Sequence, residues 1–193
     1  MSEKLWDSFA VIDGKRISLR PAVVNDRHIV YDWLVHSDCT VSFMGEPTYP
    51  DMPLPTWKEF CSDYKLHFFN GSLPEKGISF IIMCDGVPAG HINYNDIDCE
   101  KKRTELDIWM SSELYCGHGY GTYALQSLCD YLKNYHNVYE FVIRPSARNK
   151  RAIRSYTKAG FVVQKMTTEQ QEKKYGPGDC YDSVVMVKEL LRE

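Results

Sequence analysis

One stretch decides the fold, residues 107–132, which reads DIWMSSELYCGHGYGTYALQSLCDYL. It begins with strand-forming residues, continues with Gly117, Gly119 and Gly121 at every second position, and ends in a segment with apolar residues at helical spacing. Glycine has no Cβ, so it can adopt positive φ angles and lets the backbone approach a ligand closely. The stretch therefore predicts a strand, a glycine-rich turn and a helix in succession.

A turn of this kind leaves several N–H groups open at the positive end of the helix dipole, which is a ready site for phosphate. The helix that follows carries one apolar face, formed by Leu125, Leu128, Cys129 and Leu132. We therefore expect the turn to hold the pyrophosphate of a nucleotide-like cofactor.

The bulk properties describe an ordinary globular chain. It has 193 residues, 44% hydrophobic and 25% charged, with a formal net charge of −3. This length suits a single domain spanning residues 1–193. Because no basic stripe is present, we expect no nucleic-acid partner.

The seven cysteines are odd in number and contain no C-x-x-C pair. This spacing argues against a disulfide framework and against a zinc site, and it favours reduced thiols. The first fifteen residues contain no apolar leader segment, and the apolar run 78–84 is too short to span a bilayer. These features predict a cytoplasmic protein that does not bind membranes.

The remaining elements follow from periodicity and turn signals. Strands are expected at 16–20, 77–84, 87–94, 103–110, 139–143, 161–165 and 183–188, and helices at 25–35, 56–69 and 148–159 besides the one after the glycine turn. Residues 1–15, the proline-rich segment 45–55 and the polar segment 167–179 are expected to be loops. This order predicts an α/β (α+β) fold with a mixed, mostly antiparallel central sheet and helices on both faces.

The glycine turn does not match the dinucleotide fingerprint G-x-G-x-x-G. Its third glycine comes one residue early, and Thr122 stands in the expected place. Antiparallel strands precede the turn and no βαβαβ series follows it, so a nucleotide-dependent dehydrogenase is disfavoured.

The pattern at 116–121 instead resembles the turn that GNAT-superfamily N-acetyltransferases place on the pyrophosphate of acetyl-CoA. Residues 144–161, RPSARNKRAIRSYTKAGF, are similar to the strand–helix–strand element that follows in that superfamily, including Asn149, Tyr156 and Gly160. The resemblance covers roughly residues 16–190 and implies the GNAT fold, with acetyl-CoA as co-substrate.

Within the superfamily the chain is most similar to aminoglycoside 6′-N-acetyltransferases, which also have an Asp ten residues before the first turn glycine, here Asp107. Cys116 and His118 depart from the residues usual in the turn. Backbone N–H groups do most of the phosphate binding, so we expect cofactor binding to survive. The cofactor-binding residues that the resemblance implies are Trp109, Met110, Ser111, Cys116, Gly117, His118, Gly119, Tyr120, Gly121, Thr122 and Asn149.

Acetyl transfer to an amine needs a group that removes the ammonium proton, and a carboxylate beside the acceptor can do this. Asp107 is the candidate general base, and the alternative is a solvated Asp at the end of a strand. Glu105 lies two residues earlier on the same side and is the reserve candidate.

The resemblance gives Tyr156 the role of donating a proton to the departing sulfur, and the alternative is a core tyrosine. Asn149 would hydrogen-bond the pantetheine arm, or else only cap its helix. Residues 109–111 would pair their backbone with the pantetheine amides and supply an oxyanion N–H.

Cys116 at a helix N-terminus invites interpretation as a nucleophile. Only His118 could be its partner, and it would point away if the turn amides face phosphate, so we interpret Cys116 as structural. The histidines are too dispersed for a metal site, and no metal is expected.

The acceptor side is less defined. The loops 45–55 and 167–180 could cover the amine. An apolar floor could come from Tyr49, Trp57, Tyr94, Trp109 and Tyr175, and cationic groups could be received by Asp51, Asp96, Asp98 and Asp179.

The sequence thus predicts an N-acetyltransferase, monomeric or homodimeric, that acts on a small-molecule amine by direct transfer in a ternary complex. The favoured acceptor is the 6′-amine of an aminoglycoside or a similar polyamine-like molecule. The alternatives are acetylation of a protein N-terminus and a CoA-binding regulatory module without turnover.

Overall fold

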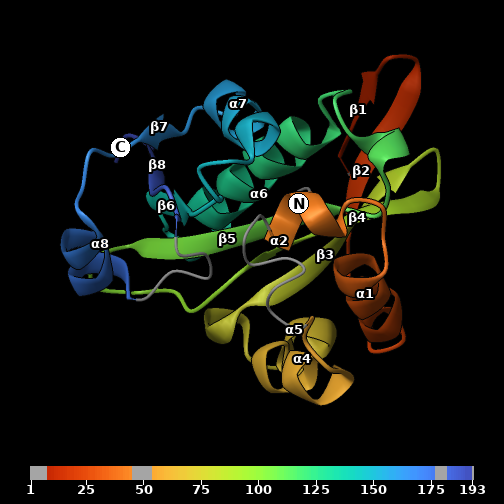
Figure 1. Ribbon diagram of the computed structural model, residues 1–193, viewed down its shortest axis with the longest axis horizontal. Helices are drawn as coiled ribbons and strands as arrows, with labels where there is room; N and C mark the ends of the chain where they lie inside the picture. Colours follow the sequence, from red (N-terminus) through yellow and green to blue (C-terminus); the bar gives the residue numbers. More distant parts are fainter. Residues whose placement is uncertain (1–7, 45–53, 177–181, 193) are drawn as a thin grey trace.

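The computed structural model describes residues 8–44, 54–176 and 182–192. Within these residues the chain forms one eight-stranded sheet in the order β1-β2-β3-β4-β5-β6-β8-β7 (Figure 1). Neighbouring strands are antiparallel except β5 and β6, which are parallel. The prediction of a mixed, mostly antiparallel sheet is confirmed.

The strands are β1 (Phe9–Ile12), β2 (Lys15–Pro21), β3 (Ile78–Cys84), β4 (Val87–Tyr94), β5 (Arg103–Met110), β6 (Glu140–Ile143), β7 (Val162–Val163) and β8 (Met186–Glu189). The α-helices are α1 (Asp26–Val35), α2 (Thr40–Met44), α4 (Trp57–Asp63), α5 (His67–Asn70), α6 (Tyr120–His136), α7 (Lys150–Lys158) and α8 (Thr168–Tyr175). The described residues also include the short 3₁₀ turns η2 (Pro74–Lys76) and η3 (Glu113–Tyr115).

Alternation along the strands supplies apolar side chains to both faces of the sheet. In β3, Phe80 and Ile82 pack into the core beneath α6 and α7, whereas Ile81 packs into the core against α1, α4 and α5. Figure 1 shows α6 and α7 on one face and α1, α4 and α5 on the other. The expected arrangement of helices on both faces is therefore confirmed.

The predicted face of α6 forms the centre of the larger core. Its residues Leu125, Leu128, Cys129 and Leu132 are all fully buried. Burial of apolar area on this scale is the main source of stability for such a domain. It fixes α6, and the turn before it, against the middle of the sheet.

The strands β5 and β6 form a fork. Their parallel pairing runs only from Arg103 opposite Glu140 to Glu105 opposite Val142. β6 then ends at Ile143, two residues before Pro145, which has no N–H to continue a ladder. The second half of β5 therefore has no pairing with β6.

Local signals located several boundaries well. The Asp85-Gly86 hairpin turn is present, with φ angles of 50° and 81°. Thr56 and Glu59 form the expected capping box at the start of α4. Gly160 follows α7 with a φ of 97°, as a C′ glycine does.

Other predictions were wrong. Residues 9–12 form β1, which pairs with β2 across a turn at Asp13-Gly14, rather than a polar lead-in. The helix expected over 56–69 is broken into α4 and α5, and the expected loop 167–179 contains α8, which begins with a Thr167–Gln170 capping box. β7 and β8 are shorter than expected.

Most of the proline-rich loop, residues 45–53, lies outside the described residues, as do residues 177–181. In the described ranges, none of the helices has the length and apolar character needed to cross a bilayer.

A buried histidine should make stability depend on pH. His91 in β4 is fully buried, its Nε2 lies 2.9 Å from the Ser79 hydroxyl oxygen, and its ring packs against Trp109. Burial lowers the pKa of His91 from 6.5 to about 3, with a smaller opposing effect from the charge of Asp26. The native state thus keeps this ring neutral at pH values where the unfolded chain binds a proton.

This contribution to stability is complete above pH 6.5 and is lost as the pH falls toward 3. We predict that the free energy of unfolding falls by up to about 1.4 kcal/mol per pH unit below pH 6. The His91→Gln variant should show a flatter profile. Urea denaturation at several pH values measures both proteins, and equal slopes would contradict the prediction.

Candidate functional site

A cavity of about 330 Å³ lies where the free half of β5, the glycine-rich turn and α7 meet. Most of the sequence-predicted site residues line it. These are Trp109, Met110, Cys116, Gly117, Gly119, Tyr120, Gly121, Thr122, Asn149 and Tyr156. Residues separated by almost fifty positions in the chain are thus gathered at one opening.

The turn has the backbone form that its glycines permit. Gly117 and Gly119 have φ angles of 83° and 90°, which side chains rarely tolerate. Gly119 is the N-cap of α6 and makes no side-chain cap. The first N–H groups of a helix have no partner within it, so this terminus is suited to bind an anion.

The second half of β5 turns alternate peptide groups toward the cavity. Glu105 accepts from the Asn95 N–H and the Ser111 N–H donates to Ala89, so the odd-numbered residues pair with β4. The peptide groups of Ile108 and Met110 therefore face the fork. Ser111 was expected to bind the cofactor through its backbone, and its N–H donates to the Ala89 carbonyl instead of facing the fork.

Asp107 lies on β5 among amide side chains. Its Oδ2 accepts hydrogen bonds from Asn95 Nδ2 at 2.8 Å and from Asn93 Nδ2 at 3.3 Å. It is therefore held in position rather than simply solvated.

Tyr156 projects from α7, is nearly buried, and lines the cavity. Burial raises the pKa of the Tyr156 phenol, and the nearby charge of Asp107 raises it further. The phenol is therefore protonated at neutral pH.

Glu105 faces the same side as Asp107 but is engaged elsewhere. Arg144 Nε lies 2.6 Å from its Oε1 and Arg144 Nη2 lies 2.8 Å from its Oε2. A carboxylate whose two oxygens both accept hydrogen bonds from one guanidinium group is a poor proton acceptor. The ion pair with Arg144 therefore favours Asp107 over the reserve candidate Glu105.

Two other predicted cofactor residues have partners within the protein. Asn149 Oδ1 accepts from the Ala152 N–H at 3.0 Å, as an N-cap does, and Asn149 Nδ2 donates to the Ser42 carbonyl at 2.8 Å. The His118 side chain is outside the cavity lining, and its Nδ1 lies 3.2 Å from Asp13 Oδ2.

Sequence reasoning missed the basic residues of α7. Arg151, Arg154 and Lys158 all line the cavity, together with Ser155. Their spacing of three and four residues places them on one helix face, and that spacing was the available signal. Arg151 forms a bidentate ion pair with Glu113.

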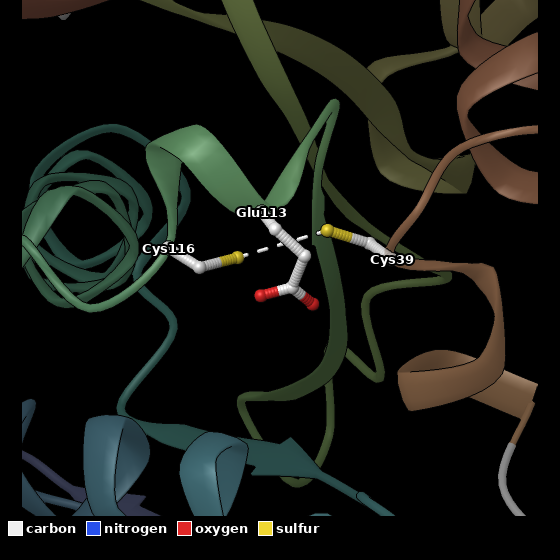
Figure 2. Close-up of side chains that lie close together, drawn as sticks. All are labelled: Cys39, Glu113 and Cys116. Carbon is white, nitrogen blue, oxygen red and sulfur yellow. Dashed lines mark hydrogen bonds between the residues drawn. The ribbon is translucent and has the colours of Figure 1, made fainter.

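Cys116 lines the cavity and contacts a second cysteine rather than a histidine. Its Sγ lies 3.7 Å from the Sγ of Cys39, and the Glu113 side chain lies beside the pair (Figure 2). Within the described residues, these three side chains form the one cluster with metal-ligating atoms close together.

A second cavity, of about 190 Å³, lies farther along β5 and next to β6. Its lining residues are Asn95, Asp96, Asp98, Arg103, Thr104, Glu105, Val142 and Tyr175. Three of these are carboxylates, and each has a cationic partner: Asp96 pairs with Lys76, Asp98 with Lys101, and Glu105 with Arg144.

The expected floor of the acceptor site is only partly correct. Tyr94 is fully buried in the core beneath α6, where its hydroxyl donates to the Pro74 carbonyl, and Trp57 stacks on His28. Tyr175 lines the second cavity. Tyr49, Asp51 and Asp179 lie outside the described residues.

Residues 16–162 match the model of the acetyltransferase (GNAT) domain. The chain is 34% identical over 85 residues to spermidine N(1)-acetyltransferase of Escherichia coli K12, a match that spans 44% of this chain and only 45% of that protein. It is 24% identical over 163 residues to aminoglycoside N(6′)-acetyltransferase type 1 of Klebsiella pneumoniae, covering 79% of this chain and 77% of that one.

Solved structures agree on the fold. An aminoglycoside acetyltransferase in complex with coenzyme A and kanamycin gives a TM-score of 0.65 at 24% identity, covering 90% of this chain and 94% of that chain. A spermidine N-acetyltransferase from Vibrio cholerae, with CoA and spermine, gives 0.65 at 17% identity, covering 89% and 94%.

The turn offers a matched pair of substitutions. Gly119→Ala places a Cβ at a φ of 90°, and we predict that it lowers the free energy of unfolding by about 1 kcal/mol or more. At Gly121 an added Cβ meets nothing nearer than Ile108 Cδ1 at 3.6 Å, so Gly121→Ala should leave stability unchanged or slightly higher. Urea denaturation compares the two, and equal effects would contradict this account.

Proposed function

The chain belongs to the GNAT acetyltransferase family, and we propose that it transfers an acetyl group from acetyl-CoA to a primary amine of a small cationic acceptor. Acetyl-CoA, when bound, supplies a thioester as the acyl donor. The observation that carries most of the proposal is the fork between β5 and β6, where Tyr156 lines the cavity and Asp107 is close enough for its charge to raise the pKa of the Tyr156 phenol.

The residues that line the cavity are suited to bind acetyl-CoA, the acyl donor. The open amides at Gly117–Gly121 and the N-terminus of α6 suit a diphosphate. Arg154 and Lys158 add positive charge on the same wall of the cavity. The peptide groups of Ile108 and Met110, which face the fork, suit the amides of an extended pantetheine arm.

The side chains around the fork have complementary proton-transfer roles. Asp107, oriented by Asn93 and Asn95, accepts the proton of the acceptor ammonium, which leaves the amine nucleophilic. Tyr156 keeps its proton at neutral pH and gives it to the departing sulfur. The two groups thus act as base and acid in a direct transfer without an acyl-enzyme.

The proposed acceptor is the 6′-amine of an aminoglycoside, with a polyamine as the nearest alternative. The second cavity begins at Glu105, two residues from Asp107 on the same face of β5. Its Asp96 and Asp98 pair with exposed lysines, which the ammonium groups of a polycation can displace. Relatives and neighbours named for aminoglycoside and for spermidine acetylation support this class of acceptor.

An acceptor screen tests the proposal. Thiol release from acetyl-CoA would be followed with aminoglycosides, spermidine and spermine, and peptides with free N-termini. Turnover with an aminoglycoside supports the proposal. Turnover with peptides alone would show that the acceptor is a protein N-terminus rather than an aminoglycoside. Tight CoA binding measured by calorimetry, without turnover of any acceptor, would favour a regulatory module.

The base assignment predicts a pH signature. Asp107→Asn should lower kcat/KM by about 10²-fold or more below the pKa of the acceptor amine and by less above it, since the amine is then already neutral. Glu105→Gln is the matched comparison, because Glu105 pairs with Arg144 and its loss should alter KM rather than the profile's shape. A pH-independent loss in Asp107→Asn would remove Asp107 from the base role.

The acid assignment predicts a separation between catalysis and binding. Tyr156→Phe keeps the ring that packs in the core but removes the proton, so kcat should fall by about 10²-fold while the Kd for CoA stays within about twofold. Steady-state kinetics and calorimetry measure the two effects. Weakening of CoA binding by about tenfold would instead make Tyr156 a structural residue.

A further inference from the structure

Two cysteines from distant parts of the chain meet at the edge of the donor cavity. Cys39 lies between α1 and α2, and Cys116 lies directly before the glycine-rich turn. Their Sγ atoms are 3.7 Å apart although the residues are separated by 77 positions (Figure 2). Cys39 is fully buried, whereas Cys116 is half-buried and lines the cavity.

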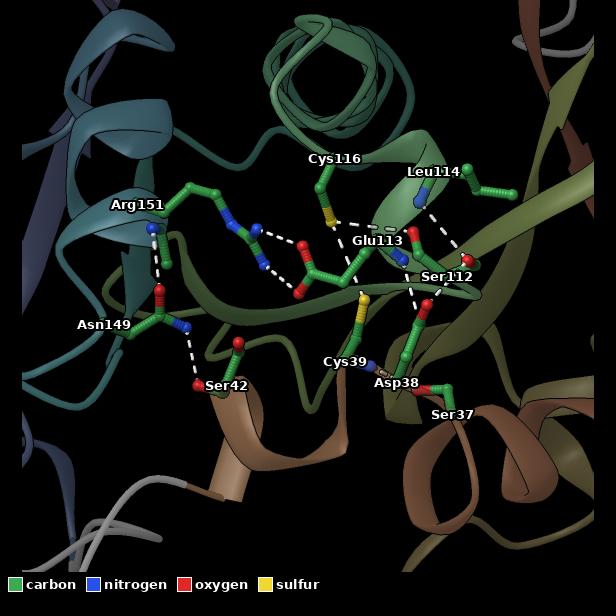
Figure 3. A network of polar contacts seen from close by, with 11 residues as sticks. Ser37, Asp38, Cys39, Ser42, Ser112, Glu113, Leu114, Cys116, Asn149 and Arg151 are labelled. Carbon is green, nitrogen blue, oxygen red and sulfur yellow. Dashed lines mark hydrogen bonds and ion pairs between the residues drawn. The ribbon is translucent and has the colours of Figure 1, made fainter.

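The surrounding hydrogen bonds fix the backbone next to both cysteines (Figure 3). Asp38 accepts from the Ser112 hydroxyl at 3.1 Å and from the Glu113 N–H at 2.8 Å, which joins the residues next to Cys39 to those before Cys116. A disulfide has an S–S distance of about 2.05 Å, so the sulfurs need to approach by about 1.7 Å.

The two thiols differ in character. The hydrogen bond from Cys39 lowers the pKa of the Cys116 thiol, and the Arg151 guanidinium lowers it further against the effect of burial. The same hydrogen bond, together with burial, raises the pKa of Cys39. Cys116, which lines the cavity, is thus the more acidic thiol of the pair, and Cys39 is the less acidic one.

We propose that Cys39 and Cys116 are a site of oxidative modification, at which a hydroperoxide converts the two thiols into a disulfide that weakens acetyl-CoA binding. The second half of this proposal rests on the proposed function, and the first does not. The Sγ–Sγ contact and its position beside the glycine-rich turn carry it.

The reaction balances with the peroxide as two-electron oxidant. The Cys116 thiolate attacks one peroxide oxygen, the O–O bond breaks, and a sulfenic acid and a hydroxide form. The Cys39 sulfur then attacks the Cys116 sulfur, the S–O bond breaks, and the Cys39 proton leaves with the second hydroxide as water. The first hydroxide takes up the proton that the Cys116 thiol released on ionising. With hydrogen peroxide, two thiols are thus oxidised to one disulfide and one peroxide is reduced to two waters.

A metal ion is the competing interpretation of the same cluster. The two sulfurs and a Glu113 oxygen lie within 4.8 Å of one another, and all three are zinc-ligand types. However, the Glu113 carboxylate is held by both oxygens against Arg151, whose positive charge opposes a second cation. No fourth ligand belongs to the cluster among the described residues. These contacts favour a redox pair.

The disulfide affects the donor site through the chain next to it. Cys116 is bonded directly to Gly117, whose φ of 83° helps to set the direction of the turn amides. Drawing Cys116 toward Cys39 moves these amides relative to α6 and to the basic face of α7, so the diphosphate loses part of its hydrogen bonding.

The test treats the full-length reduced protein with hydrogen peroxide. Intact mass should fall by two hydrogen atoms, and non-reducing peptide mapping should link Cys39 to Cys116. The Kd for CoA, measured by calorimetry, should rise about tenfold and return after dithiothreitol. Cys39→Ser should abolish both changes.

Cys99 provides the matched control, because it is exposed and lies outside both cavities. Cys99→Ser should behave as the wild type. Oxidation at Cys99 without the Cys39–Cys116 link would overturn the proposal, as would stoichiometric zinc that blocks the link.

The outcomes separate the two proposals. A link that forms without changing the Kd for CoA would overturn the regulatory half. If the reduced protein binds no CoA, the proposed function fails, whereas the mass and mapping results still decide whether the cysteine pair is oxidised. Should Cys39→Ser fold poorly, the Cys116→Ser variant and peptide mapping of the wild type still decide whether the Cys39–Cys116 disulfide forms.

Discussion

The parting of β5 from β6 is the constraint on which the rest of the site depends. Their parallel ladder stops after Glu105 opposite Val142. Buried peptide groups need hydrogen-bond partners, and β6 offers none to the second half of β5, so an extended ligand can pair with the strand there. The Glu105–Arg144 ion pair stands at this point, where β6 ends ahead of Pro145.

The catalytic groups and the cofactor-binding groups come from different layers of the fold and meet at the fork. The core beneath α6 fixes the glycine-rich turn on one side, and α7 brings Tyr156 and a row of basic residues to the same opening. Asp107 comes from the strand itself and is oriented by two asparagines of the β4 edge. Each group is held by a different element, so the geometry depends on the packing of all three.

Sequence signals that act over a few positions predicted several of these elements. The strand–turn–helix, the hairpin at Asp85-Gly86 and the capping box at Thr56 each depend on residues within a few positions of one another. It failed for β1 and α8, and for the break between α4 and α5. The apolar run Phe9–Ile12 is only four residues long, and its pairing with β2 at the edge of the sheet is what makes it a strand.

The sequence by itself determined the fold class, the glycine-rich turn and the residues that gather around it, because turn and helix signals act through nearest neighbours and backbone angles. Only the tertiary structure decided that Glu105 pairs with Arg144, that Asn149 bonds Ser42, and that Cys39 touches Cys116, across 39, 107 and 77 positions. It also decided which peptide groups of β5 face the fork. These contacts depend on strand order and register, which local propensity does not encode.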